Sequence, residues 1–388
     1  MSEGEALMGG GRIRLGMVGG GEDAFIGVVH RIASRIDDHY AFVAGALSST
    51  PEKSARSAAA LGLDPARSYP DFVSMAKAEA ARPDGIEAVS IVTPNHLHVP
   101  AAKAFLDAGI HVICDKPLAI SLAEARELET VVARSGRILA LTHTYTGYPL
   151  IRQARAMVDA GELGDIRIVK VEYAQDWLAE KIEDSGHKQA EWRSDPARSG
   201  AGGCIGDIGT HAFNLAGFVT GLEVAELCAE MTTFVPGRRL DDDVQILLRY
   251  ANGARGSLWA SQVAVGQENG LTLRVYGSKS SIEWHQTEPN RMIWSPLGRN
   301  MEIVSRNGAG ANDASRRVAR IPAGNPEGYL EAFATLYSEI AQAIKAARRG
   351  DRPPAGVVFP TLADGMDGLA FIEASIRSSQ SGGTWTRL

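Results

Sequence analysis

The chain has 388 residues, of which 45% are hydrophobic and 22% charged, enough for two domains with sizeable cores. Its formal net charge is -6, so it has no excess of basic residues to bind phosphates, and nucleic acid is not an expected partner. Its three cysteines are too few for a disulfide framework, and no apolar run approaches the roughly 18 residues of a membrane helix. These features indicate a cytoplasmic globular protein without membrane attachment.

The chain begins with a polar segment and then a strand that runs into glycines. Residues 1–11 combine Gly, Glu and Ser, which is typical of a disordered leader and not of a signal peptide. Arg12–Val18 is predicted to be a strand, and Ile26–Ile36 has the apolar spacing of a helix, with Ile26, Val29, Ile32, Ala33 and Ile36 on one face.

Glycines between the strand and the helix would let a pyrophosphate approach the backbone at the helix amino end. Gly19 and Gly21 match the motif G-x-G-x-x-G, and its third position falls on Ala24, followed by Phe25 and Ile26. Glu22 and Asp23 place two negative charges beside the expected phosphates. Either both carboxylates point outward, or Gly27 takes the third role in a longer loop.

The second predicted strand, Tyr40–Leu47, carries no carboxylate at its end, where NAD recognition usually places one for the ribose hydroxyl. Ser48 and Ser49 stand there instead, with Lys53 and Arg56 just beyond. Hydroxyls with nearby cations would accept a 2′-phosphate. The sequence therefore favours NADP over NAD and leaves both open.

A third strand is predicted over Ala88–Val92, after helices over Pro51–Leu61 and Tyr69–Ala80. It ends in a polar turn, and we expect Thr93, Pro94 and Asn95 to lie along the nicotinamide half of a dinucleotide. His96 and His98 could suggest a metal site, but no acidic or cysteine partner accompanies them, so no metal is predicted. His98 is expected at the start of a helix near the cofactor.

The stretch 110–118 ends in Asp115-Lys116-Pro117 after a short β-branched run that predicts a buried strand. An ammonium at the carboxyl end of a parallel strand can meet a substrate, and Pro117 could hold it through a cis peptide bond. The alternative is a surface lysine in a turn. Helices over Val99–Ala108 and Leu122–Ser135 and a strand over Ile138–Thr142 complete the alternation of a doubly wound parallel sheet.

The second half reads as a mainly antiparallel sheet after a helix over Ile151–Ala160. Asn252-Gly253 is a two-residue hairpin signal between two of its strands. Helices follow over Glu327–Arg348 and Thr361–Ser379, and the last could pack back on the first domain. The predicted strands are Ile166–Gln175, Val224–Val235, Val244–Tyr250, Gly256–Val263, Leu271–Tyr276 and Ser281–His285.

A second chemical stretch lies between the first two of these strands, with Trp192-Arg193 followed by a glycine-rich run to Asp207 and His211. Asp207 and His211 are four residues apart, so on a helix both side chains would face the same way. A carboxylate beside an imidazole can orient it and raise its basicity, as a general acid/base requires. The alternative is a helix amino terminus with an incidental histidine.

Taken together, the glycine-rich first turn, Asp115-Lys116-Pro117 and Asp207-x-Gly-x-His211 resemble the glucose-fructose oxidoreductase / inositol dehydrogenase / MocA (Gfo/Idh/MocA) family. The resemblance runs from about Arg12 to Ser379. The chain departs from the family pattern by Asp115 in place of the common Glu, by the longer first turn and by the missing acid after the second strand. The last two departures put the cofactor choice in doubt.

The resemblance implies an α/β fold, with a Rossmann domain over residues 12–145, a substrate-binding and oligomerisation α+β domain over 146–360 and a C-terminal helix and tail over 361–388. It implies hydride transfer between NAD or NADP and a carbon of a sugar, glycoside or cyclitol. Lys116 would contact the reacting hydroxyl, His211 would take its proton, and Asp207 would bind substrate hydroxyls and orient the imidazole. A homodimer or homotetramer is also implied, through the open sheet.

Polyol recognition needs hydrogen-bonding groups and a flat apolar face. The stretches expected to border the cleft supply Tyr145, Tyr148, Asp176, Trp177, Lys188, Trp192 and Arg193, of which about half should touch substrate. Tyr145 and the pair Trp192-Arg193 are the main candidates beside Asp207 and His211. Two other interpretations remain: a sensor that has lost turnover, and an enzyme with a tightly bound cofactor that either cycles between two sugars or mediates a redox-neutral elimination. The intact set of Lys116, Asp207 and His211 argues against the sensor.

Overall fold

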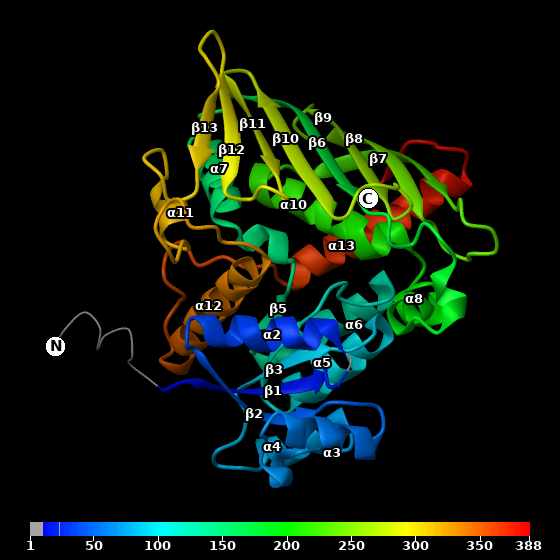
Figure 1. Cartoon of the computed structure of the whole chain (residues 1–388), viewed down its shortest axis with the longest axis vertical. Coiled ribbons are helices and arrows are strands. Elements are labelled where there is room, and N and C mark those ends of the chain that lie inside the picture. The colour runs from blue at the N-terminus through cyan, green and yellow to red at the C-terminus, as the bar shows by residue number, and fades with distance from the viewer. Residues whose placement is uncertain (1–10, 23) are drawn as a thin grey trace, which may run out of the picture.

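The computed structural model describes residues 11–22 and 24–388. The expected leader, residues 1–11, therefore lies almost entirely outside the described residues, as does Asp23. The described chain builds two sheets, one below the other in Figure 1, with helices between them. This is the expected combination of a doubly wound parallel sheet and a larger, mainly antiparallel one.

The first sheet is parallel and has the strand order β2-β1-β3-β4-β5. A parallel bridge between Gly45 and Ser68 continues it beyond β2, which gives the usual order of dinucleotide-binding folds. The strand order reverses beside β1, so a ligand is expected at the carboxyl ends of β1 and β3. The strands are β1 (Ile13–Gly19), β2 (Tyr40–Ala46), β3 (Ala88–Val92), β4 (His111–Cys114) and β5 (Leu139–Leu141).

Helices lie on both faces of this sheet, as the sequence predicts. They are α2 (Phe25–Ile36), α3 (Pro51–Ala60), α4 (Phe72–Ala80), α5 (His98–Asp107) and α6 (Leu122–Ser135), with short 3₁₀ turns η1 (Pro65–Arg67), η2 (Asn95–Leu97) and η3 (Thr144–Gly147). The helix expected from Tyr69 begins only at Phe72, because the Asp71 carboxylate caps it by accepting from the Ser74 backbone N–H at 2.7 Å.

The predicted buried face of α2 is partly wrong. Val29 and Ala33 are buried, but Ile32 is 40% and Ile36 38% exposed. The reason is a helix from the far end of the chain, α12 (Tyr329–Arg348), which packs on α2. Because α12 covers the neighbouring face of α2, His30 on that face is buried, and Ile32 and Ile36 are not.

The second sheet has nine strands in the order β13-β12-β11-β10-β6-β9-β8-β7-β14. Only β6 and β9 pair in parallel, and Asn252-Gly253 lies in the β8–β9 hairpin as expected. The sequence did not predict the short strands β12 to β14. The strands are β6 (Ile166–Ala174), β7 (Val224–Thr232), β8 (Asp243–Tyr250), β9 (Arg255–Ser261), β10 (Gly270–Gly277), β11 (Ser280–His285), β12 (Arg291–Pro296), β13 (Glu302–Ser305) and β14 (Thr386–Arg387).

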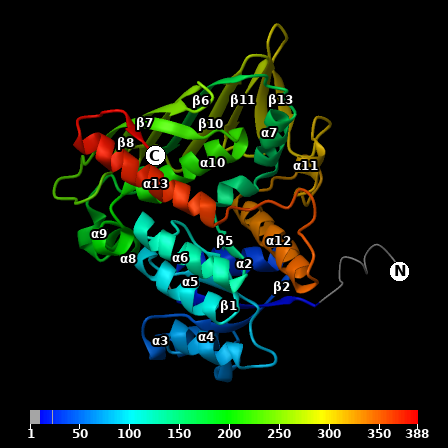
Figure 2. The same cartoon turned by 180° about the vertical axis from the view of Figure 1, so that it is seen from behind.

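One face of this sheet is covered by α7 (Pro149–Asp159), α10 (Thr210–Thr220) and α13 (Leu362–Gln380), and Figure 2 shows α13 running between the two sheets. Three short helices lie outside this layer: α8 (Lys188–Arg193), α9 (Pro196–Ser199) and α11 (Asp313–Arg316). No helix in the described part of the chain has both the length and the apolar character to cross a membrane.

The chain returns to the first sheet after building the second. The Tyr337 hydroxyl on α12 lies 2.7 Å from both His30 Nδ1 and Ser90 Oγ, and Tyr40 donates to its backbone carbonyl at 2.9 Å. Helix α13 contacts α6 on one side and β7 on the other. The two sheets therefore share helices, and the division at residues 145 and 360 remains a prediction.

Candidate active site

A groove of about 590 Å³ opens at the carboxyl ends of β1, β2, β3 and β4 and extends to α8. This is where the reversal of strand order predicts a ligand. Of the residues singled out from the sequence, it is lined by Gly19, Ala24, Ile26, Ser48, Ser49, Thr93, Pro94, Asn95, Asp115, Lys116, Trp192, Arg193 and Asp207.

Other predicted residues lie outside the groove lining. Phe25 is 70% exposed, His98 is buried beneath the strand ends, and Tyr145 and His211 are buried deeper between the sheets. Gly21, Lys53 and Pro117 also do not line it. Lys188, a candidate for polyol recognition, and His96, considered and dismissed as a metal ligand, also line it. The sequence reading missed lining residues on three segments: Pro70, Asp71 and Phe72; Leu97; and Gln189, Glu191 and Arg198. Asp71 precedes the apolar residues at the start of α4, a pattern typical of a helix cap. This pattern could have identified Asp71 as the residue where α4 begins, at the edge of the groove.

The glycine loop is built for close approach of the backbone. Gly19 and Gly20 have φ of +77° and +72°, which side-chain-bearing residues rarely adopt. A Cβ on Gly27 would lie 2.4 Å from the Gly20 Cα, so Gly27 allows the helix to pack against the strand. It takes the role assigned to the third glycine of the motif, while Ala24 stands just before α2 and lines the groove.

The acidic residue of this loop that the structure describes points away from the groove. The Glu22 carboxylate lies 3.9 Å from Arg56, and its backbone N–H donates to Ser57 Oγ at 3.1 Å. This agrees with an outward orientation, whereas Asp23 lies outside the described residues. The same ion pair engages Arg56, one of the cations expected to attract a 2′-phosphate.

Among the described residues that line the groove, three polar atoms are buried without a hydrogen-bond partner: Thr93 Oγ1, His96 Nδ1 and Arg193 Nε, the last of which lies 3.4 Å from Asp207 Oδ2. Buried polar groups are normally satisfied, so these atoms are suited to a bound ligand. Together with the glycine loop at the amino end of α2, they fit a dinucleotide that lies from Gly19 toward Lys116.

The loops that carry Thr93 and Lys116 are tied together from below by His98. Its Nδ1 lies 2.7 Å from the Pro117 carbonyl and its Nε2 lies 2.9 Å from the Thr93 carbonyl. The Lys116–Pro117 peptide is cis, as expected. Asp115 adds rigidity, because its Oδ1 accepts from the Lys116 backbone N–H at 3.0 Å and from Thr142 Oγ1 at 2.9 Å. His98 and Asp115 thus position the lysine.

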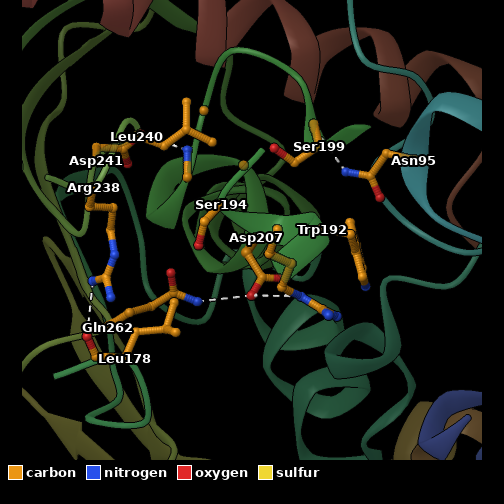
Figure 3. Close-up of a pocket in the computed structure, with 14 residues that line it drawn as sticks. Asn95, Leu178, Trp192, Ser194, Ser199, Asp207, Arg238, Leu240, Asp241 and Gln262 are labelled. Carbon is orange, nitrogen blue, oxygen red and sulfur yellow. Dashed lines mark hydrogen bonds and ion pairs between the residues drawn. The ribbon is translucent and has the colours of Figure 1, made fainter. Parts of the chain in front are cut away.

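Lys116 points across the groove to Asp207. Its Nζ lies 2.9 Å from Asp207 Oδ1 and also donates to the Asp207 backbone carbonyl. Asp207 Oδ2 accepts from Gln262 Nε2 at 2.8 Å and lies 3.4 Å from Arg193 Nε (Figure 3). Burial raises the pKa of Asp207, but the Lys116 and Arg193 charges outweigh it and hold the pKa well below its usual range. Asp207 is therefore an anion.

Asp207 lies in a turn of π-helix, Ile205–Gly209, which continues directly into α10. The buried Asp241 carboxylate holds the start of this turn by accepting from the backbone N–H groups of Gly203 at 2.6 Å and Ile205 at 2.8 Å. Such turns are frequent at functional sites. Because this turn is not α-helical, the expected pairing across four residues does not form: no hydrogen bond between Asp207 and His211 occurs in the described structure.

His211 is held by aromatic rings instead. Its ring centroid lies 4.9 Å from that of Tyr145 and 5.3 Å from that of His143, both edge to face. Its Nδ1 is buried and has no hydrogen-bond partner. Burial, followed by the Lys116 and His143 charges, lowers the pKa of His211 well below its usual value. The imidazole is therefore neutral and able to accept a proton.

Tyr145 belongs to a polar network under the second sheet. Its hydroxyl bonds to that of Tyr173, which donates to Asn269 Oδ1 at 2.8 Å. Gln175 donates to the same oxygen at 2.7 Å. Trp192 lines the groove, and the Arg193 guanidinium carbon lies 4.2 Å from the centroid of its ring. The described residues contain no cluster of three His, Cys, Asp or Glu that could hold a metal ion.

Family models match both parts of the chain: the oxidoreductase family with an NAD-binding Rossmann fold over residues 13–143, and the GFO/IDH/MocA C-terminal domain over 151–283. The chain belongs to the Gfo/Idh/MocA family. Among curated Gfo/Idh/MocA relatives, it is 35% identical over 377 residues to the uncharacterized oxidoreductase YfiI of Bacillus subtilis, with 96% of each chain covered. It is 30% identical over 300 residues to levoglucosan dehydrogenase of Pseudarthrobacter phenanthrenivorans, covering 70% of this chain and 73% of that one.

Solved structures of the family agree in fold over almost the whole chain. An oxidoreductase from Sinorhizobium meliloti is 52% identical, with a TM-score of 0.89 and 97% of this chain and 100% of that one covered. An inositol dehydrogenase homolog from Azotobacter vinelandii was solved with NAD⁺ (37% identity, TM-score 0.94) and with NADH and myo-inositol (36%, TM-score 0.92). Each covers 97% of this chain and 98% of that one.

Proposed function

We propose that this protein is an NAD-dependent dehydrogenase that oxidises a secondary hydroxyl of an uncharged polyol, such as an inositol or a pyranose. The observation that carries the proposal is the Lys116–Asp207 ion pair at the inner end of the dinucleotide groove, with neutral His211 four residues beyond Asp207. The relatives solved with NADH and myo-inositol or named levoglucosan dehydrogenase support it.

Each residue has a distinct role in this proposal. Bound nicotinamide would accept the hydride, which the side chains cannot do. Lys116 donates a hydrogen bond to the reacting hydroxyl and fixes its position beside the groove. His211 accepts the hydroxyl proton as the hydride leaves the same carbon. Asp207 holds the Lys116 ammonium in place and offers a carboxylate to neighbouring substrate hydroxyls.

The charges of the groove favour a neutral substrate over a sugar phosphate. Arg193 pairs with Asp207, and Arg198 lies 3.4 Å from the Glu191 carboxylate. Lys116 is paired as described, and Lys188 also has an interaction partner. A phosphate would have to take one of these cations from its partner, whereas hydroxyls can join the existing network.

For the cofactor we favour NAD, against the preference for NADP drawn from the sequence. Asp71 lines the same groove as Ser48 and Ser49, and hydrogen bonds from Ser74 lower the pKa of its carboxyl, so it is charged. A carboxylate there repels a 2′-phosphate and can accept from a ribose hydroxyl. Of the cations expected to attract the phosphate, Arg56 is paired with Glu22 and Lys53 has a partner.

The proposal is tested by following reduction of NAD and NADP across a panel of inositols, aldoses, glycosides and their phosphates. We expect turnover with NAD on a neutral polyol and none on its phosphate. Faster turnover on a phosphorylated sugar would contradict the neutral-substrate assignment. Dinucleotide binding without turnover on any alcohol would favour a sensor, and cofactor that co-purifies with the protein would favour an enzyme that cycles it between two sugars.

We also propose a cytoplasmic homo-oligomer. The face of the second sheet opposite α7, α10 and α13 carries the exposed side chains of Ile168, Leu247 and Tyr276, and such patches often mark subunit contacts. Light scattering of the purified protein would give the dimer or tetramer mass, and Leu247→Arg should reduce it. A monomeric wild-type protein would contradict this assignment.

A further inference from the structure

The region behind His211, away from the groove, contains several buried polar atoms without partners. They are Nδ1 of His211, Nδ1 of His143 and Oδ1 of Asn214. Three such atoms in one apolar interior each cost free energy while they lack a partner, and water molecules could satisfy them. We call the region that joins them the passage. The proposed reaction needs one ring nitrogen of His211, and it gives no role to His143 or Asn214.

The passage leads from His211 to Asp364 at the start of α13. The backbone of residues 360–361 runs beside β5, since the Leu141 N–H donates to the Pro360 carbonyl at 2.9 Å. His143 is the second residue after β5. Asn214, one helical turn after His211 on α10, donates to Asp364 Oδ1 at 3.4 Å. Asp364 is only half-buried, so its carboxylate can exchange protons with solvent.

His143 lies between the two ends of this passage. Its ring meets the His211 ring edge to face at 5.3 Å. Burial lowers the pKa of His143 to about 4, and the Asp364 charge acts in the opposite direction, ahead of the smaller effects of Lys116 and Asp115. The ring is therefore neutral at rest, and a proton on it is attracted toward Asp364.

We propose that His143 and Asp364 form the exit path for the proton that His211 removes from the substrate. This inference rests on the proposed dehydrogenase function. In one turnover the substrate C–H electron pair leaves as hydride to the nicotinamide, and the hydroxyl proton passes to His211. An N–H proton then leaves His211 for His143, with the passage waters as carriers, and reaches solvent at Asp364. His211 returns to its neutral form for the next turnover.

The charged and titratable groups that face this path are few. Lys116, Asp207 and His143 act on His211, while Asp364, Lys116 and Asp115 act on His143. Lys116 disfavours a proton on either imidazole, and the carboxylates favour one. The substrate side of the path is thus dominated by the ammonium and the far side by Asp364, which directs the proton outward.

The first test measures the connection without any substrate. Side-chain ¹⁵N NMR of the histidine-labelled full-length protein should show that His143→Phe changes the tautomer signals of His211. Asp364→Asn should move the titration of His143 to lower pH, because the attracting charge is lost. His30→Phe is the matched control, since His30 is equally buried, has a pKa lowered to about 4 and lies on α2 with its ring against Phe333 of α12. It should leave both signals unchanged.

The second test uses the polyol found in the panel. His143→Phe should lower kcat about tenfold with little change in KM and raise the solvent isotope effect. His143→Ala, which leaves a cavity of imidazole size, should lose kcat in the same way and regain activity in concentrated imidazole buffer. Asp364→Asn should show the same changes to a smaller extent. A loss of kcat that imidazole does not restore, or His211 signals that ignore both variants, would overturn the path. If coupled signals appear in a protein that oxidises no alcohol, the dehydrogenase assignment fails and the proton-exit role fails with it, although the two histidines are shown to be connected.

Discussion

Asp207 and His211 lie four residues apart in the chain, but they are held in opposite ways. Asp207 is fixed by charge, with Lys116, Gln262 and Arg193 on its two oxygens. His211 is fixed by shape, between the rings of Tyr145 and His143, without a hydrogen bond at Nδ1. In the proposed mechanism the site therefore separates two tasks: the ion pair positions the substrate, and the neutral imidazole, which has no hydrogen bond at Nδ1, accepts the proton.

The largest effect should follow from breaking the ion pair between Lys116 and Asp207. Lys116→Met should reduce kcat at least about a hundredfold, since the hydroxyl loses its donor. It should also lower the free energy of unfolding by about 1–3 kcal/mol, because the Asp207 anion loses its main partner. Adding Asp207→Asn should recover part of the stability and none of the turnover. Steady-state kinetics and urea unfolding measure the two effects.

Lys103→Met is the matched control for this prediction. Lys103 Nζ pairs with Glu127 at 2.7 Å on the surface, and surface pairs contribute little. The kcat and the free energy of unfolding of the Lys103→Met protein should stay near the wild-type values. A Lys116→Met protein that folds, binds NAD and turns over like wild type would contradict the role given to the ion pair.

Substitution of His211, which is held by aromatic rings, should affect turnover but not stability. His211→Asn should lower kcat by about a hundredfold or more while the NAD dissociation constant and the unfolding midpoint change little. The physical reason is that His211 provides a proton acceptor but no bond on which the fold depends. Calorimetric titration with NAD and a thermal scan separate the effects. An equal loss of cofactor affinity would mean that His211 holds the nucleotide instead.

The neutral histidines should make stability depend on pH. His143 has a folded pKa of about 4, below its unfolded value of about 6.5, so the unfolded chain binds more protons between these values. Its contribution to stability is fully present above pH 6.5 and falls as the pH drops toward 4. Urea unfolding from pH 7 to 4.5 should show a shallower loss in His143→Phe than in wild type. Parallel curves would contradict the lowered pKa.

The smallest expected effect concerns the nucleotide. Asp71→Asn should bring the affinities for NAD and NADP closer by several-fold, and Ser48→Asp should increase the preference for NAD, because a carboxylate repels a 2′-phosphate. Fluorescence titrations with both nucleotides give the ratio. If neither variant changes the ratio, another part of the groove recognises the ribose.

The sequence predicted those features that depend on local periodicity and turn chemistry. The alternation of strands and helices, the hairpin at Asn252-Gly253 and the placement of Lys116 after β4 are local signals, and the structure has all three. The three short strands β12 to β14 escaped prediction. Each has at most six residues and is defined mainly by pairing with a neighbour.

Long-range packing explains what the sequence reading got wrong about the site. The exposed Ile32 and Ile36 reflect α12, which arrives from some 300 residues further along the chain. Asp207 and His211 are not hydrogen-bonded because Asp207 lies in a π-helical turn. That turn is held by the carboxylate of Asp241, which lies some 35 residues further along the chain. Neither partner is visible in the local pattern, so spacing alone could not reveal them.

The return of the chain through α12 limits how this fold can be divided. A fragment that ended near residue 145 would contain all five parallel strands, but it would leave the partners of Tyr337 and the apolar face formed by Ile13, Leu15 and Tyr40 uncovered. The nucleotide-binding unit is therefore not expected to fold as an isolated fragment. Junctions before α7 and ahead of α12 would exchange strands β6 to β13, whereas α13 and β14, which also pack on the second sheet, would stay with the nucleotide-binding unit.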